Sequence, residues 1–179
     1  AYKCANVTQL FETADYVTSG DNDAEIVSRL KAIVGAEEPI SEKFLIRRTL
    51  STLGILKFGN KVENRMLALI PLCGFKREKM LGEFYYRKTD KPVTFDKYRV
   101  ETGEKAVRRY ETDFTPYEIV ALIKAALEDK VALYTEEIAS VACVALRLPK
   151  VTDKFAAYIN DCVTLGEERG LFVRSVSDR

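Results

Sequence analysis

The sequence predicts a mainly α-helical chain with a little β-structure, an α+β fold built from two tandem helix-turn-helix units. Three helical segments lie between residues 23 and 70, a β-hairpin pattern follows them, and the same order returns from Thr115 onward. Three helices followed by a hairpin are typical of a winged helix. We expect an extended lead-in over 1–22, a winged-helix-like repeat over 23–88, a connector over 89–114, and a second such repeat with a reduced wing over 115–179.

Two helices are expected before residue 54. The first has N-caps at Asp21 to Asp23 and ends before Pro39. Its apolar residues recur at helical spacing: Ile26, Val27, Leu30, Ile33 and Val34. Ile40 then forms a short extended segment, and Ser41 caps the second helix. The buried side of that second helix is predicted to be Leu45, Ile46, Leu50 and Leu53.

The stretch from Leu53 to Met66 predicts a turn feeding a recognition-type helix. Gly54 closes the preceding helix in a left-handed conformation, Asn60 and Glu63 have capping-box spacing, and Pro71 ends or kinks the new helix. One face is apolar, with Val62, Met66, Leu69 and Ile70. The other face is cationic and amide-bearing, with Lys61, Asn64 and Arg65. This pattern is typical of a helix that enters a DNA groove.

A β-hairpin is expected after Gly74. Residues 75–80 and 83–87 form its strands, and Leu81-Gly82 form its turn. The cations of this wing are Lys76, Arg77, Lys79, Arg87 and Lys88. The aromatic residues Phe84, Tyr85 and Tyr86 could stack on bases, but a strand with one core side and one surface side explains them better.

The connector is charged and poor in apolar residues. Its acidic residues, Asp90, Asp96, Glu101 and Glu104, fit a linker better than a metal site. Arg108, Arg109 and Tyr110 are expected to be solvated, while Val93, Phe95, Tyr98 and Val100 could lie along a domain surface.

The second repeat matches the first in order and spacing. Glu25-Ile-Val returns at Glu118, Ile40-Ser-Glu at Tyr134, and the Gly82–Arg87 strand at Gly170–Arg174. Lys57 and Lys61 return as Lys150 and Lys154. A capping box with proline opens the copy at Thr115. Its third helix begins near Thr152 and buries Phe155, Ile159, Cys162 and Val163. Its outward face (Lys154, Ala157, Tyr158, Asp161) is less cationic, and its wing is one strand from Leu171 to Arg174.

Composition excludes several kinds of chemistry. The chain has no histidine, so catalytic triads and HExxH metal sites are impossible within it. No phosphate-binding glycine loop occurs, and the four cysteines form no CxxC pair. We expect no catalytic residue, no metal site and no cofactor. No apolar run approaches membrane-spanning length and no signal-peptide pattern is present, so we expect no membrane binding. The scattered cysteines favour reduced thiols in a cytoplasmic protein. Because the chain starts at Ala1 and not at an initiator methionine, we expect a fragment of a longer protein.

Positive charge collects in the first repeat, although the net charge of the chain is only +1. Residues 41–91 carry twelve basic and five acidic groups, while 1–40 and 92–179 are net acidic. A basic surface of this kind favours a polyanion, and a solvated basic face is the plainer alternative. The predicted DNA-binding residues are Lys57, Asn60, Lys61, Asn64, Arg65, Lys76, Arg77, Lys79 and Arg87.

Three stretches carry a family resemblance: Glu37 to Ile40, Leu53 to Val62, and Thr115 to Ile119. They resemble the uncharacterised C-terminal domain of large bacterial superfamily I helicase-related proteins, which often carry a restriction-endonuclease-like nuclease domain upstream. The resemblance covers roughly residues 25–174. It implies that any ATPase or nuclease chemistry lies in domains outside this chain, and that those domains are partners within one polypeptide.

Two functions remain open from the sequence. The first is a non-catalytic DNA-binding accessory module that contacts the DNA backbone with little sequence preference. The second is a structural or protein-interaction module that docks on the parent helicase core or forms a homodimer, since winged helices also pack against proteins.

Overall fold

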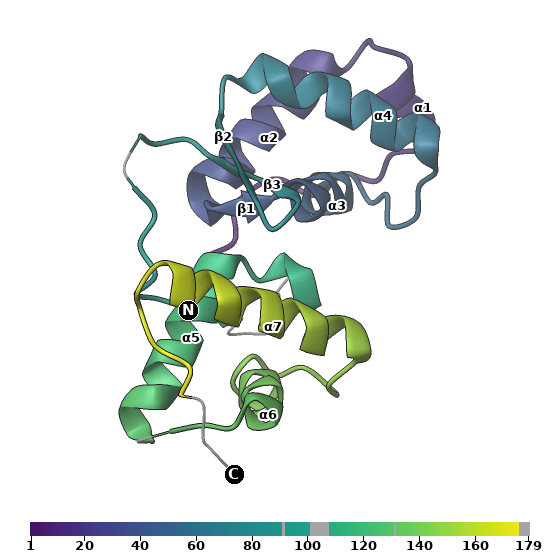
Figure 1. Ribbon diagram of the computed structural model, residues 1–179. Helices are drawn as coiled ribbons and strands as arrows, with labels where there is room; N and C mark the ends of the chain where they lie inside the picture. The colour runs from purple at the N-terminus through teal and green to yellow at the C-terminus, as the bar shows by residue number, and fades with distance from the viewer. Residues whose placement is uncertain (91, 101–107, 131, 176–179) are drawn as a thin grey trace. The chain divides into compact units, whose positions relative to one another are not determined.

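The chain forms two compact units in the computed structural model (Figure 1). The structure describes residues 1–90, 92–100, 108–130 and 132–175. The first unit contains Ala1–Pro92. The second contains Val93–Val100 and the chain from Arg109 onward. The predicted α+β class is confirmed, because most elements are helices and one small antiparallel sheet accompanies them. The predicted connector therefore contributes residues 93–100 to the second unit, and Glu101 and Glu104 lie outside the described residues.

The described residues of the first unit form four helices and a short 3₁₀ turn. They are α1 (Ala14–Thr18), α2 (Asp23–Glu37), α3 (Glu42–Thr52), α4 (Asn60–Leu69) and η1 (Ile70–Cys73). The three predicted helices are confirmed, and their apolar stripes form the core because each stripe faces the other helices. The largest fully buried side chains here include Phe44, Ile26, Leu30, Leu50 and Met66.

The helix starts follow the sequence in one case and depart from it in another. The Ser41 hydroxyl accepts a hydrogen bond from the Phe44 amide at 3.2 Å, so the predicted cap of α3 is confirmed. The predicted capping box at Asn60 is wrong. Gly59 is the N-cap of α4, and no side chain caps this end. Asn60 is already helical, so its side chain lies one position past the place where it could cap.

The sheet has three strands, of which the hairpin was predicted. β2 (Lys76–Met80) and β3 (Glu83–Arg87) pair antiparallel through a turn at Leu81 and Gly82, both with positive φ. β1 (Ile40–Ser41) pairs with the other edge of β3, so the order is β1-β3-β2. β3 is therefore central, and the neighbouring Tyr85 and Tyr86 are both buried although they point to opposite faces. The prediction that one side of this strand faces solvent is wrong for these two residues.

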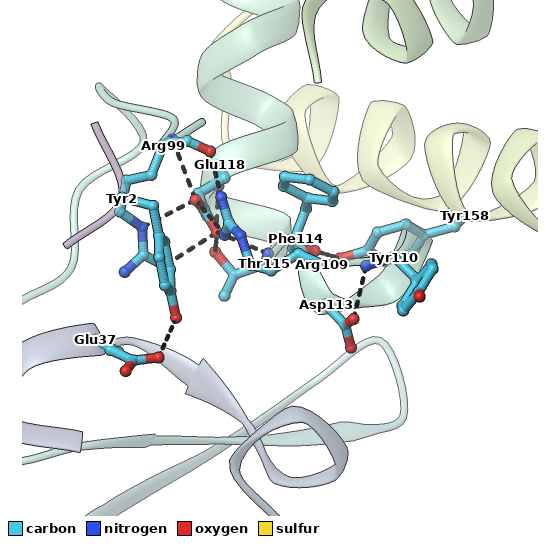
Figure 2. A network of polar contacts seen from close by, with 10 residues as sticks. All are labelled: Tyr2, Glu37, Arg99, Arg109, Tyr110, Asp113, Phe114, Thr115, Glu118 and Tyr158. Atoms are coloured by element: carbon cyan, nitrogen blue, oxygen red, sulfur yellow. Dashed lines mark hydrogen bonds and ion pairs between the residues drawn. The ribbon is translucent and has the colours of Figure 1, made fainter. Parts of the chain in front are cut away.

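The buried carboxylate of Glu37, at the end of α2, anchors the start of the lead-in. The Tyr2 hydroxyl donates to the Glu37 carboxylate at 2.7 Å (Figure 2), and Arg48 Nε donates to the same group at 3.0 Å. The Leu10 and Glu12 amides donate to the backbone at the end of α3. The short helix α1 within the lead-in has no signal in the apolar pattern, since Val17 is its only buried residue.

Gly54 is the position in the turn where a side chain should cost most. Its φ is +74°, and an added Cβ would lie 3.1 Å from the Leu10 carbonyl oxygen and the Phe11 Cα. We expect Gly54→Ala to lower the free energy of unfolding by at least about 1–2 kcal/mol, since left-handed backbone disfavours a Cβ. Urea unfolding followed by circular dichroism measures this. Gly35→Ala, inside α2, would place its Cβ in ordinary van der Waals contact, 3.8 Å from Lys88 Cδ, and should instead stabilise by about 0.5–1 kcal/mol. Equal effects of the two substitutions would contradict this account of the turn.

In the second unit, the residues that the structure describes form three long helices. They are α5 (Pro116–Asp129), α6 (Thr135–Ala145) and α7 (Asp153–Glu168), and a 3₁₀ turn η2 (Glu111–Asp113) precedes them. The predicted capping box at Thr115 is confirmed, with proline in the first turn of α5. The predicted buried face of α7 is confirmed as well. The N-caps of the three helices, Thr115, Tyr134 and Thr152, each follow an N-cap of the first unit by 93 positions: Asn22, Ser41 and Gly59.

The turn after α6 repeats the hydrogen bonds of the turn after α3. The Ile55 amide donates to the Leu50 carbonyl at 3.0 Å, and the Leu148 amide donates to the Cys143 carbonyl at 2.9 Å. Arg147 has a φ of +57° where the first unit has Gly54. The backbone of this turn is therefore common to both units.

Two predictions for the second unit are wrong. Leu171 to Arg174 is not a strand, and no strand occurs among the described residues of this unit. Phe172 instead packs on α7, where Gly166 leaves space for its ring. Tyr158 is buried, not outward-facing, because its hydroxyl donates to the Phe114 carbonyl at 2.6 Å.

A buried carboxylate organises the start of the second unit. Figure 2 shows Arg99 and Arg109 directed at Glu118 of α5. Arg99 Nε and Arg109 Nη1 each donate to Glu118 Oε1 at 2.9 Å, and the Thr115 amide donates to Oε2 at 3.0 Å. Arg109 is only 2% exposed, so the prediction that it is solvated is wrong. Its guanidinium is buried because a carboxylate is buried beside it.

Candidate nucleic-acid interface

The turn before α4 and the first two turns of α4 expose four of the predicted residues. Lys57, Asn60, Lys61 and Asn64 are all exposed, and we call this set the α4 polar face. They project outward because the opposite side of the helix is anchored in the core through Val62, Met66 and Leu69. The N-terminal end of α4, whose first backbone amides have no partner within the helix and receive no side-chain cap, belongs to the same stretch of chain. Two ammonium groups, two amides and a helix N-terminus all suit phosphate oxygens.

The Arg65 side chain is less available for a ligand than these four residues. It is half-buried, and its Nη2 forms an ion pair with Asp23 at the start of α2. The sequence placed Arg65 on the outward face correctly by helical spacing, but spacing within α4 carries no information on a carboxylate from another helix. The role of Arg65 in the structure is to tie α4 to α2.

The hairpin exposes three cations along β2. Lys76, Arg77 and Lys79 are exposed, while Arg87 on β3 is half-buried. The Arg77 guanidinium lies 4.3 Å from the centre of the Phe84 ring, and Lys79 Nζ lies 5.7 Å from it. Lys76 Nζ forms an exposed ion pair with Asp90 at 3.0 Å. Such a pair contributes little and can be exchanged for a phosphate.

A half-open pocket of about 160 Å³ lies at the base of the hairpin. It is lined by Ile70, Pro71, Phe75, Arg77 and Tyr86, and we call it the wing-base pocket. Tyr86 donates to the Glu42 carboxylate at 2.5 Å and has a hydrogen bond with Arg77. Burial, together with the hydrogen bond to Glu42, raises the pKa of Tyr86 well above its usual value, so the phenol stays neutral.

The described part of the chain gives little support for a metal site, a nucleophilic cysteine or a membrane-spanning helix. No group of three or more histidine, cysteine, aspartate or glutamate side chains is placed to hold a metal ion there. Burial raises the pKa of the Cys143 and Cys162 thiols, which makes them poor nucleophiles. Among the same residues, every helix is too short or too polar to cross a lipid bilayer.

The second unit has only part of this arrangement. Lys150 and Lys154 are exposed at the positions that correspond to Lys57 and Lys61. Ala157 and the buried Tyr158 stand where the first unit has Asn64 and Arg65. Lys154 Nζ also lies 3.9 Å from Glu111. Cationic groups therefore concentrate in the first unit.

No family model, curated protein or solved structure matches this chain. The resemblance to the C-terminal domain of helicase-related proteins therefore stays a prediction that rests on the quoted residues. The same holds for the predicted DNA-binding residues, whose roles are argued from the geometry alone.

The wing-base pocket is the feature that the sequence did not indicate. Phe75 and Tyr86 were assigned to the two strands of the hairpin, and Pro71 was taken only as the point where a helix ends or kinks. A partial signal existed, since an aromatic residue directly precedes β2 and others lie in β3. Their convergence depends on the strand register, in which Arg77 pairs with Tyr86.

Proposed function

We propose that the first unit is a winged helix and that the chain is a non-catalytic DNA-binding accessory module of a larger helicase- or nuclease-type protein. The observation that carries this proposal is the pairing of a basic turn and helix, Lys57 to Asn64, with a basic hairpin, Lys76 to Arg87, in one small unit. The element order α2-β1-α3-α4-β2-β3 with sheet order β1-β3-β2 supports the winged-helix assignment.

Binding should depend on the DNA backbone more than on base sequence. Lysine and arginine dominate the proposed contact set, and both suit phosphates. The α4 polar face has two asparagines that could reach base edges. It has no arginine to form two hydrogen bonds with a guanine, since the neighbouring Arg65 is in an ion pair with Asp23. We expect an affinity in the range of non-specific DNA binding, about micromolar at low salt.

The second unit has a different proposed role. We propose that it is a degenerate copy of the first, because its helix starts recur at constant spacing while the sheet does not. It exposes apolar side chains on and near α6: Tyr134 at 64%, Val144 at 79% and Val151 at 40%. Exposed apolar side chains favour contact with another protein. The alternative function of the chain is therefore to dock on the parent helicase core or on a second copy of itself.

A fluorescence anisotropy titration tests the proposal. The full chain is added to labelled 20-base-pair duplexes of two unrelated sequences in low salt. Saturable binding at about micromolar concentration, equal within threefold for the two sequences, is the expected result. No binding at low salt, or a stable dimer by light scattering that DNA cannot dissociate, would favour the docking alternative.

A further inference from the structure

We propose that the wing-base pocket binds an unpaired pyrimidine nucleotide of DNA, with the base against Pro71, Phe75 and Tyr86 and the phosphate on Arg77. This inference rests on the proposed DNA binding by the first unit. It names the DNA structure that the unit prefers, which is a duplex bearing a single-stranded overhang.

The size of the pocket selects the base. Its volume is about 160 Å³. A protein cavity of about 150 Å³ accommodates benzene, which is one six-membered ring. The wing-base pocket therefore has room for the single ring of a pyrimidine, whereas the second ring of a purine would extend through its open side.

The walls of the pocket suit a flat, weakly polar ring. Ile70 and Pro71 provide aliphatic contacts, and Phe75 and Tyr86 provide two rings whose centroids lie 6.0 Å apart at an interplanar angle of 59°. Proteins recognise single-stranded DNA largely by stacking bases on aromatic side chains, which tolerates any sequence. The Tyr86 hydroxyl is held by Glu42 at 2.5 Å, so this ring is already fixed before a base arrives.

Arg77 brings a positive charge to the same pocket. It lines the cavity and is exposed, with Lys76 and Lys79 close to it on β2. A guanidinium has five donors, and the hydrogen bond with Tyr86 and the contact with the Phe84 ring leave donors for a phosphate. The Glu42 carboxylate already accepts the Tyr86 hydroxyl. An apolar ring pocket with a cation at its edge matches a nucleotide better than it matches an uncharged aromatic ligand.

The test is an NMR titration of the isotope-labelled full chain with thymidine 5′-monophosphate, compared with deoxyadenosine 5′-monophosphate. We expect saturable shifts of the Phe75 and Tyr86 ring signals and of Arg77 Nε–H with the pyrimidine, and at most weak shifts with the purine. Phe75→Leu should weaken the pyrimidine nucleotide about fivefold or more through lost stacking. Leu72→Ala, a matched control next to the pocket at an exposed side chain, should leave the titration as in the wild type.

The second part of the test compares the affinity of the chain for two DNA duplexes. The full chain should bind a duplex with a thymidine overhang at least about fivefold more tightly than the blunt duplex, and Phe75→Leu should bring the two affinities together. Blunt-duplex binding without nucleotide shifts would overturn the pocket proposal alone. Nucleotide shifts without any duplex binding would overturn the proposed function of the unit instead. Equal shifts with both nucleotides would overturn the pyrimidine selection.

Discussion

Replacing Glu118 with glutamine should destabilise the second unit by about 3–5 kcal/mol, the usual cost of removing one partner from a buried ion pair. Glu118 is 2% exposed and accepts hydrogen bonds from Arg99, Arg109 and the Thr115 amide. Glutamine keeps the size but not the charge, so it removes the carboxylate that forms the ion pair with the buried Arg109 guanidinium. Thermal unfolding followed by NMR measures the loss, because signals of the second unit can be observed separately.

Glu128→Gln is the matched control, since Glu128 lies on the same helix and is exposed. It should change stability by no more than about 0.5 kcal/mol. A loss of less than about 1 kcal/mol in Glu118→Gln would contradict the view that this carboxylate organises the unit.

The ion pairs of Glu118 with Arg99 and Arg109 predict that the stability of the second unit falls in acid. Burial alone would raise the pKa of Glu118, but the charges of Arg99 and Arg109 outweigh it and hold the pKa below the ordinary 4.5. A lowered folded-state pKa means that the stabilisation is complete above the unfolded value and is lost as pH falls through the folded value. The wild type should therefore lose stability below about pH 4.5, and Glu118→Gln should show a smaller loss over that range.

Reversing the charge of Lys57 and Lys61 should weaken duplex binding by roughly 60-fold or more in 0.1 M salt. Each neutralised phosphate contributes about 0.9 log unit of counterion release at that concentration, and two contacts are lost. Both side chains are exposed and lie outside the core, so their replacement should not unfold the unit. Fluorescence anisotropy of Lys57→Glu/Lys61→Glu against the wild type measures the change.

The second unit supplies an internal control for this prediction. Lys150→Glu/Lys154→Glu makes the same charge change at the corresponding positions, on the same type of turn and helix. We expect it to weaken duplex binding less than fivefold. Equal losses in the two double variants would show that overall charge, and not the α4 polar face, governs binding.

The helices were predictable because their signals are local. Apolar spacing in α2 and the Ser41 and Thr115 caps are all readable within one turn of the residues concerned. The hairpin was predictable for the same reason, since Leu81-Gly82 supports a tight turn. The pairing of β1 with β3 was not, because a two-residue strand has no pattern of its own and its partner lies more than forty residues later.

The partners of charged side chains were the least predictable part of the site. Arg65 has the helical position of a surface residue, yet Asp23 from another helix binds it. Arg109 was expected to be solvated because it lies in a charged connector that is poor in apolar residues. In the structure that one carboxylate both caps α5 and binds two arginines. Sequence spacing cannot reveal such double use.

The salt dependence of duplex binding tests the central claim most directly. Five of the predicted site residues are exposed cations: Lys57, Lys61, Lys76, Arg77 and Lys79. If three to five of them neutralise phosphates, the logarithm of the association constant should fall against the logarithm of salt concentration with a slope of about −3 to −5. Lys57→Glu/Lys61→Glu should make that slope shallower by about two. A slope near zero, or the same slope in both proteins, would contradict DNA backbone binding by the first unit.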